Sequence, residues 1–96
     1  MPTFSVIMPT YQGADTIARS IKSVQRQSLS DWELIIVNDG SPDHTNEVVE
    51  PFLEDSRIRY FVQDNKGVSA ARNYGVSAAS SPLLVFMDSD DEVSSN

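Results

Sequence analysis

The apolar positions of the chain follow two alternating patterns. Short runs rich in β-branched and aromatic residues, typical of strands, occur at residues 4–8, 32–37, 58–62 and 83–87. The run at 32–37 is almost continuously apolar, as expected of a central parallel strand that is covered on both faces. Helical spacing is found between these runs, at residues 14–27, 45–54 and 67–79. The sequence therefore predicts strands and helices in alternation.

Each predicted helix has its own apolar or small-residue face. The first is amphipathic, with one stripe formed by Ala14, Ile17, Ala18, Ile21 and Val24. The second is expected to kink at Pro51, which lacks a backbone donor, and to turn four side chains inward: Val48, Val49, Phe52 and Leu53. The third has small residues that would allow close packing on a sheet: Ala70, Ala71, Gly75 and Ala78.

This alternation predicts an α/β fold, an open parallel sheet of about four strands with three helices on its two faces. With the strand order 3-2-1-4, the first two helices would lie on one face and the third on the other, because the winding reverses after the third strand. Ligands bind beyond the carboxyl ends of the strands at such a reversal. The first and fourth strands end there in Pro9-Thr10-Tyr11 and Asp88-Ser89-Asp90, so we expect the site between them.

Composition narrows the choice of ligand. The 96 residues suit a single domain, and a net charge of −7 argues against binding to nucleic acid or to an anionic membrane. A phosphate-bearing ligand would need a divalent cation beside these carboxylates. Without cysteine there are no disulfides or thiolate metal sites. Neither a signal-peptide pattern nor a membrane-spanning segment is evident, so we expect a soluble, cytoplasmic chain.

The acidic pair after the fourth strand is the clearest candidate for metal binding. Asp88 and Asp90 are separated by one residue at a strand end, where both carboxylates could reach a hard cation such as Mg²⁺ or Mn²⁺. The alternative is a solvated acidic loop, which is what charge runs usually form. The position after five apolar residues, at the expected crevice, favours the metal site.

Three further residues are candidates for nucleotide contacts. Asp39 follows the second strand, where a carboxylate commonly accepts hydrogen bonds from a nucleoside, although Asn-Asp-Gly-Ser is also good turn sequence. Tyr11 is either a packed surface aromatic or a contact for a base or ribose. Arg72, in the first turns of the third helix, would pair with a phosphate or form an ordinary ion pair. The segment 9–13 has one glycine where a dinucleotide fingerprint needs three, which disfavours NAD.

Read together, five motifs in this order resemble those of family 2 glycosyltransferases of the GT-A type: residues 5–11, 33–41, 65–67, 71–73 and 85–91. The resemblance implies that Pro9, Thr10 and Tyr11 line the nucleoside pocket and that Asp39 accepts a hydrogen bond from the base, usually uracil. It implies that Asp90 reaches a Mn²⁺ or Mg²⁺ ion on the diphosphate and that Asp88 lies nearer the ribose. Ser89 and Arg72 complete the nucleotide-sugar-binding residues.

The same resemblance implies an enzyme that transfers a sugar, with inversion, from a nucleoside diphosphate, UDP in most cases, to a hydroxyl of a saccharide, lipid or protein acceptor. In the family the general base follows the residues matched here, so none of residues 1–96 is assigned as catalytic. We expect 1–96 to be a donor-binding part truncated at its C-terminal end, inactive alone and self-associating through exposed apolar surface. Membrane association of the full-length protein stays open.

Two alternatives have different consequences. A non-catalytic nucleotide-binding module of the same fold would bind nucleotide without transferring a sugar. A haloacid-dehalogenase-like phosphatase would use Asp88 and Asp90 as nucleophile and acid. That arrangement belongs on the first strand of such enzymes, whereas this acidic pair follows the fourth, which disfavours the phosphatase.

Overall fold

A computed structural model describes residues 4–26 and 31–88, and within them four parallel strands form one sheet of order β3-β2-β1-β4. The strands are β1 (Phe4–Thr10), β2 (Trp32–Asn38), β3 (Ile58–Val62) and β4 (Leu84–Phe86). The helices are α1 (Ile17–Gln25), α2 (Thr45–Val49), the 3-10 helix η1 (Glu50–Glu54) and α3 (Val68–Ala78). The predicted fold class and strand order are confirmed.

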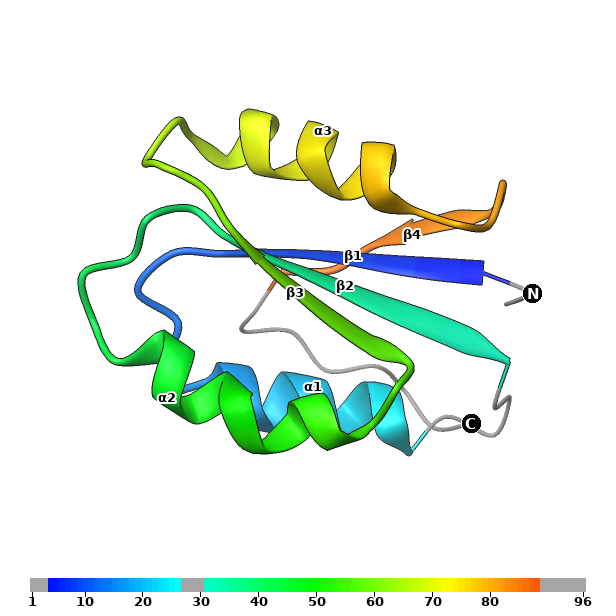
Figure 1. Cartoon of the computed structure of the whole chain (residues 1–96), viewed down its shortest axis with the longest axis horizontal. Helices are drawn as coiled ribbons and strands as arrows, with labels where there is room; N and C mark the ends of the chain where they lie inside the picture. The colour runs from blue at the N-terminus through cyan, green and yellow to red at the C-terminus, as the bar shows by residue number, and fades with distance from the viewer. Residues whose placement is uncertain (1–3, 27–30, 89–96) are drawn as a thin grey trace.

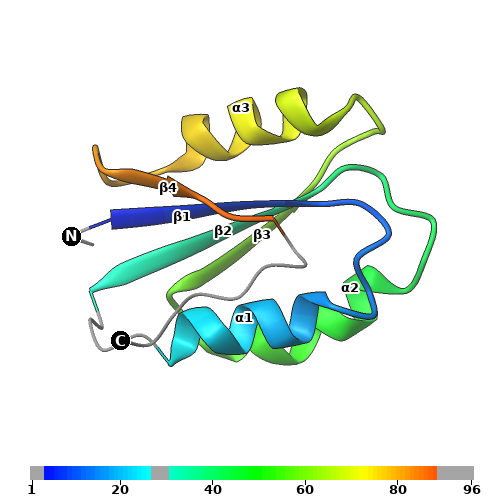
Figure 2. The same cartoon turned by 180° about the vertical axis from the view of Figure 1, so that it is seen from behind.

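The helices cover the two faces of the sheet as the winding requires. Figure 1 and the reverse view in Figure 2 show α1 and α2 on one side and α3 alone on the other. The larger buried cluster combines Met8 of β1 and Ile36 of β2 with Ile17 and Ile21 of α1. A smaller cluster lies under α3. The reversal of winding therefore places the carboxyl ends of β1 and β4 next to each other, as predicted.

The close approach of α3 depends on one glycine. A Cβ built on Gly75 would lie 2.5 Å from Cγ2 of Ile7, a side chain that is fully buried in β1. Only a residue without a side chain fits this distance, which confirms that the small face of α3 packs tightly on the sheet.

Strand β1 extends two residues beyond the prediction and includes Pro9. The N–H of Ser5 and the carbonyl of Ile7 bond toward the β4 side of the strand, to Leu83 and Met87. Because polar groups alternate sides along a strand, the nitrogen of Pro9 also faces that side, beyond the last paired residue of β4. Its missing N–H therefore removes no bond of the ladder, and the strand continues.

The second predicted helix changes type at its proline. Residues 45–49 are α-helical, whereas Pro51 lies at the start of the 3-10 helix η1. In a 3-10 helix side chains three residues apart share a face. Phe52 therefore follows the buried Val49 inward, while Leu53 turns outward and is 39% exposed. The expectation that Leu53 points inward is wrong, because it assumed α-helical spacing through the proline.

No helix within the described residues is long and apolar enough to span a bilayer.

Candidate functional site

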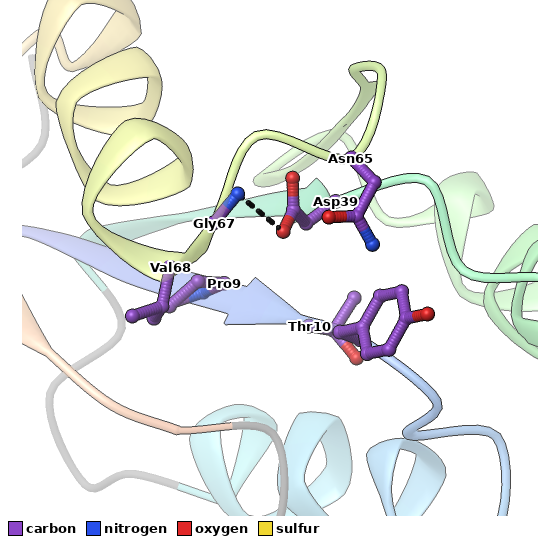
Figure 3. Close-up of a pocket in the computed structure, with 7 residues that line it drawn as sticks. Pro9, Thr10, Asp39, Asn65, Gly67 and Val68 are labelled. Atoms are coloured by element: carbon purple, nitrogen blue, oxygen red, sulfur yellow. Dashed lines mark hydrogen bonds between the residues drawn. The ribbon is translucent and has the colours of Figure 1, made fainter.

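A cavity of about 350 Å³ opens at the carboxyl edge of the sheet (Figure 3). Its walls come from the end of β1, the residue after β2, the β3–α3 loop and the first residue of α3. The lining residues are Pro9, Thr10, Tyr11, Asp39, Asn65, Gly67 and Val68. Three of the residues that the sequence proposed for a nucleoside therefore line the same hollow as Asp39.

A second cavity of about 470 Å³ adjoins the first. Its lining residues are Pro9, Tyr11, Gln12, Gly13, Thr16, Val68 and Asp88. Pro9, Tyr11 and Val68 line both cavities, so they form the divide between them. The tips of β1, β2 and β4 thus converge, with Asp39 on one side of this divide and Asp88 on the other.

The carboxylate of Asp39 holds the β3–α3 loop in place. Its Oδ1 accepts hydrogen bonds from the Gln63 side chain and the Lys66 N–H, both at 2.8 Å, and its Oδ2 accepts one from the Gly67 N–H at 2.9 Å. Figure 3 shows the bond to Gly67. Burial alone would raise the pKa of Asp39, but these donors outweigh it and hold the pKa below its usual value. Asp39 is therefore ionised at neutral pH and is more than a turn residue.

Gly40 brings the loops after β2 and β3 into backbone contact. Its φ is +68°, and a Cβ there would lie 2.7 Å from the backbone nitrogen of Asn65. This approach places Asn65 at the cavity, where its side-chain amide lies beside Asp39 (Figure 3). Sequence reasoning quoted the segment 65–67 only as a motif and assigned no role to Asn65, Gly67 or Val68. The available signal was the glycines Gly40 and Gly67, which mark tight turns in the two loops. The sequence does not show that these loops contact each other.

Thr10 and Tyr11 contribute differently to the cavity. The Thr10 carbonyl accepts a hydrogen bond from the Asp39 N–H at 2.9 Å, which ties the tips of β1 and β2 together. The Thr10 hydroxyl is buried and has no hydrogen-bond partner within the described residues. The side chain of Tyr11, in contrast, is exposed. Tyr11 therefore offers an accessible aromatic surface to a ligand, whereas the Thr10 hydroxyl is buried and is not accessible to one.

Arg72 lies close enough to Asp88 for a weak ion pair. Its Nη2 is 3.7 Å from Oδ1 of Asp88, and the two side chains are 43% and 59% exposed. At this distance and exposure the pair contributes less than about 1 kcal/mol. The guanidinium is thus beside the acidic segment, in the position from which it could exchange a carboxylate for a phosphate.

Only one of the proposed metal-binding residues lies within the described residues. Asp88 is described, whereas Ser89 and Asp90 lie outside the described residues. Residues 4–26 and 31–88 contain no group of three or more acidic, histidine or cysteine side chains arranged to hold a metal ion. The exposed Asp88 carboxylate has the oxygen chemistry that Mg²⁺ and Mn²⁺ prefer, so it fits one position of a cation's ligand set.

Comparison with known proteins identifies relatives over nearly the whole chain. The model of the family described as "Glycosyl transferase family 2" matches residues 5–96. An uncharacterized glycosyltransferase of Bacillus subtilis, EpsJ, is 46% identical over 99% of this chain and 28% of its own length. A GalNAc(5)-diNAcBac-PP-undecaprenol beta-1,3-glucosyltransferase of Campylobacter jejuni is 39% identical over 97% of this chain and 31% of its own.

Solved structures agree with this family match. Residues 1-349 of TarS from S. aureus superpose with a TM-score of 0.90 at 28% identity, over 99% of this chain and 29% of that one. The same TarS region in complex with UDP-GlcNAc gives a TM-score of 0.83 at 29% identity, over 99% of this chain and 28% of that one. The chain thus spans less than a third of the proteins named here.

Proposed function

Because the chain belongs to glycosyl transferase family 2, we propose that it forms the donor-binding part of a glycosyltransferase domain and binds a UDP-sugar. TarS, which shares the fold, has been solved with UDP and with UDP-GlcNAc. The observation that carries the proposal is the meeting of Tyr11, Asp39 and Asp88 around two adjoining cavities at the carboxyl edge of the sheet. That edge is where parallel α/β sheets bind nucleotides.

The first cavity suits the base and ribose. The exposed ring of Tyr11 and the apolar side chain of Val68 provide surfaces against which a planar base packs. Asp39 already accepts three internal hydrogen bonds, and a carboxylate has about four lone-pair positions, so one position is left for a base N–H. The amide of Asn65, at the same cavity, can both donate and accept.

The second cavity, which reaches Asp88, suits the diphosphate. Arg72 supplies one positive charge there, and Asp90, two residues on, is the proposed ligand of a Mn²⁺ or Mg²⁺ ion, with Asp88 beside it. When bound, such an ion would act as a Lewis acid on the departing nucleoside diphosphate. Transfer with inversion to an acceptor hydroxyl also needs a general base, which we place beyond residue 96, together with the acceptor pocket.

Titration calorimetry with UDP tests this assignment. We expect binding in the presence of Mn²⁺ or Mg²⁺ that is lost in chelator, and weaker binding of GDP, since the base proposed for this cavity is uracil. Asp90→Ala should remove the dependence on metal. Asp39→Asn should weaken binding by about tenfold or more, since the charge-assisted bond to the base is lost and an amide cannot accept all three bonds that hold the β3–α3 loop.

Asp55→Asn is the matched control, because Asp55 is also a hydrogen-bonded carboxylate but lies before β3, outside both cavities. It should bind UDP as the unaltered protein does. Equal affinity for UDP with metal and with chelator would exclude the metal role. Equal affinity for UDP in Asp39→Asn and in the unaltered protein would exclude Asp39 as the contact for the base.

A further inference from the structure

A relay of two side chains in the β2–α2 loop supports the segment that follows β1. The Gln12 N–H donates to Oγ of Ser41 at 2.8 Å, and the Ser41 hydroxyl donates to Oδ1 of Asp43 at 2.5 Å. Oδ2 of Asp43 accepts from the Ala14 N–H at 3.2 Å. The relay therefore joins two loops that are 29 residues apart in the sequence, at both Gln12 and Ala14.

The relay is itself fixed by its own loop. The Ser41 N–H donates to Oδ1 of Asn38 at 2.9 Å, at the end of β2. Oδ1 of Asp43 also accepts from the hydroxyl of Thr45 at 2.5 Å and from its N–H at 3.2 Å, at the start of α2. Burial would raise the pKa of Asp43, but the hydroxyl donors Ser41 and Thr45 and the backbone N–H groups lower it to about 2. Asp43 is thus a fully ionised acceptor at neutral pH.

The supported segment has an unfavourable backbone conformation. Gln12 has a φ of +55°, in the left-handed region, which costs a residue with a side chain about 1–2 kcal/mol. A non-glycine residue keeps such a conformation only where its surroundings impose it. Its N–H bond to Ser41 is one contact that restrains this turn. The preceding residue, Tyr11, lines both cavities. The Gln12 N–H belongs to the peptide that joins Tyr11 to Gln12, so its bond to Ser41 restrains the backbone at Tyr11.

We propose that Ser41 and Asp43 are positioning residues of the donor site: through the Gln12 N–H they hold the end of β1 in the left-handed turn that places Tyr11 between the two cavities. Neither residue lines either cavity, so neither is expected to touch the nucleotide. The inference rests on the proposed function for its ligand but not for its geometry. This proposal gives Ser41 and Asp43 a role. If the segment were only a turn, neither residue would have one.

The proposal is tested first without ligand, by amide hydrogen exchange of the purified protein. Ser41→Ala removes the acceptor of the Gln12 N–H, and Asp43→Asn removes the charge that orients the Ser41 hydroxyl. Both should speed the exchange of the Gln12 amide about tenfold, in line with the loss of one hydrogen bond. Asp55→Asn, which alters a carboxylate whose pKa is also about 2, should leave that amide unchanged.

The second readout is UDP affinity in the presence of Mn²⁺. Ser41→Ala and Asp43→Asn should bind UDP about fivefold to tenfold more weakly, whereas Asp55→Asn should match the unaltered protein. Adding Gln12→Gly to Ser41→Ala should recover part of the affinity, because glycine adopts a positive φ without cost.

The results separate the two proposals. Unchanged exchange at Gln12 in Ser41→Ala overturns the positioning role, as does an equal loss of UDP affinity in Asp43→Asn and Asp55→Asn. Absence of UDP binding by the unaltered protein overturns the proposed function instead. The exchange measurement then still decides whether the relay holds the turn.

Discussion

Replacing Gly40 with alanine is expected to destabilise the protein and to disturb the cavity together. Gly40 has a φ of +68°, and the added Cβ would lie 2.7 Å from the backbone nitrogen of Asn65 and 3.2 Å from the carbonyl oxygen of Gln63. Both contacts are with backbone atoms, so no rotation of a side chain relieves them. The loop after β3 would have to move, and Asn65 would move with it.

Two costs add at this position. An L-residue in the left-handed region costs about 1–2 kcal/mol, and forcing extra atoms into a packed contact costs about 1–3 kcal/mol. The expected loss for Gly40→Ala is therefore about 3 kcal/mol, which for a chain of this size lowers Tm on the order of 15 °C. Asparagine adopts a positive φ more readily than alanine but has the same Cβ. Gly40→Asn should thus lose only the steric part, about 1–3 kcal/mol.

Urea unfolding of the three proteins measures these differences, with stability taken from the midpoint at constant slope. The expected order of stability is glycine, then asparagine, then alanine, and UDP affinity should fall in both variants. If Gly40→Asn were as stable as the unaltered protein, the backbone contact with Asn65 would be refuted. The cost in Gly40→Ala would then be conformational strain alone.

Two further predictions concern acid stability and association. Asp43 and Asp55 have pKa values of about 2 in the folded protein, below the ordinary 3.8, so the stability they provide is present above about pH 4 and is lost as the pH falls toward 2. Urea midpoints between pH 2 and 6 should show this fall, and a flat profile would contradict it. We also expect self-association through the exposed apolar side chains of β4, which is an edge strand among the described residues and in which Phe86 is 51% exposed. Sedimentation should show a mass that rises with concentration and a monomer for Phe86→Asp, whereas a constant monomeric mass would exclude this association.

The sheet was predictable because its signals are local and redundant. Four apolar runs, the helical spacing between them and the handedness of parallel crossovers leave few topologies, and the order β3-β2-β1-β4 is one of them. The errors occur where a single residue changes local geometry. Pro51 converts an α-helix to a 3-10 helix and turns Leu53 outward. Pro9 continues a strand because its nitrogen faces the β4 side, beyond the last paired residue of β4.

The residues that line the first cavity were predictable only in part. Pro9 and Thr10 end β1, and Tyr11 and Asp39 directly follow β1 and β2, so the topology alone brings these residues to one edge. Asn65 lies at the same cavity because the loops after β2 and β3 contact each other at Gly40. The periodicity of apolar residues does not predict such a contact. The link from Gln12 to Ser41 also joins residues 29 positions apart, and Ser41 is a common turn residue that gives no sign of this bond in the sequence. Hydrogen bonds between loops depend on how closely the ends of different strands lie in the folded protein. No single segment of the sequence determines that distance.

The charge of the candidate site differs from that of the whole chain. A net charge of −7 suggests that a diphosphate would be repelled, yet the carboxylate of Asp39 is offset by three donors and that of Asp88 lies beside Arg72. The Lys66 and Gly67 N–H groups before α3 are bonded to Asp39, so they cannot also bind a phosphate. Arg72 can offset either Asp88 or a phosphate, and because the pair is weak, the exchange costs little. If Arg72 binds the diphosphate, a divalent ion at Asp88 and Asp90, as proposed, would supply the positive charge between these carboxylates and the phosphates.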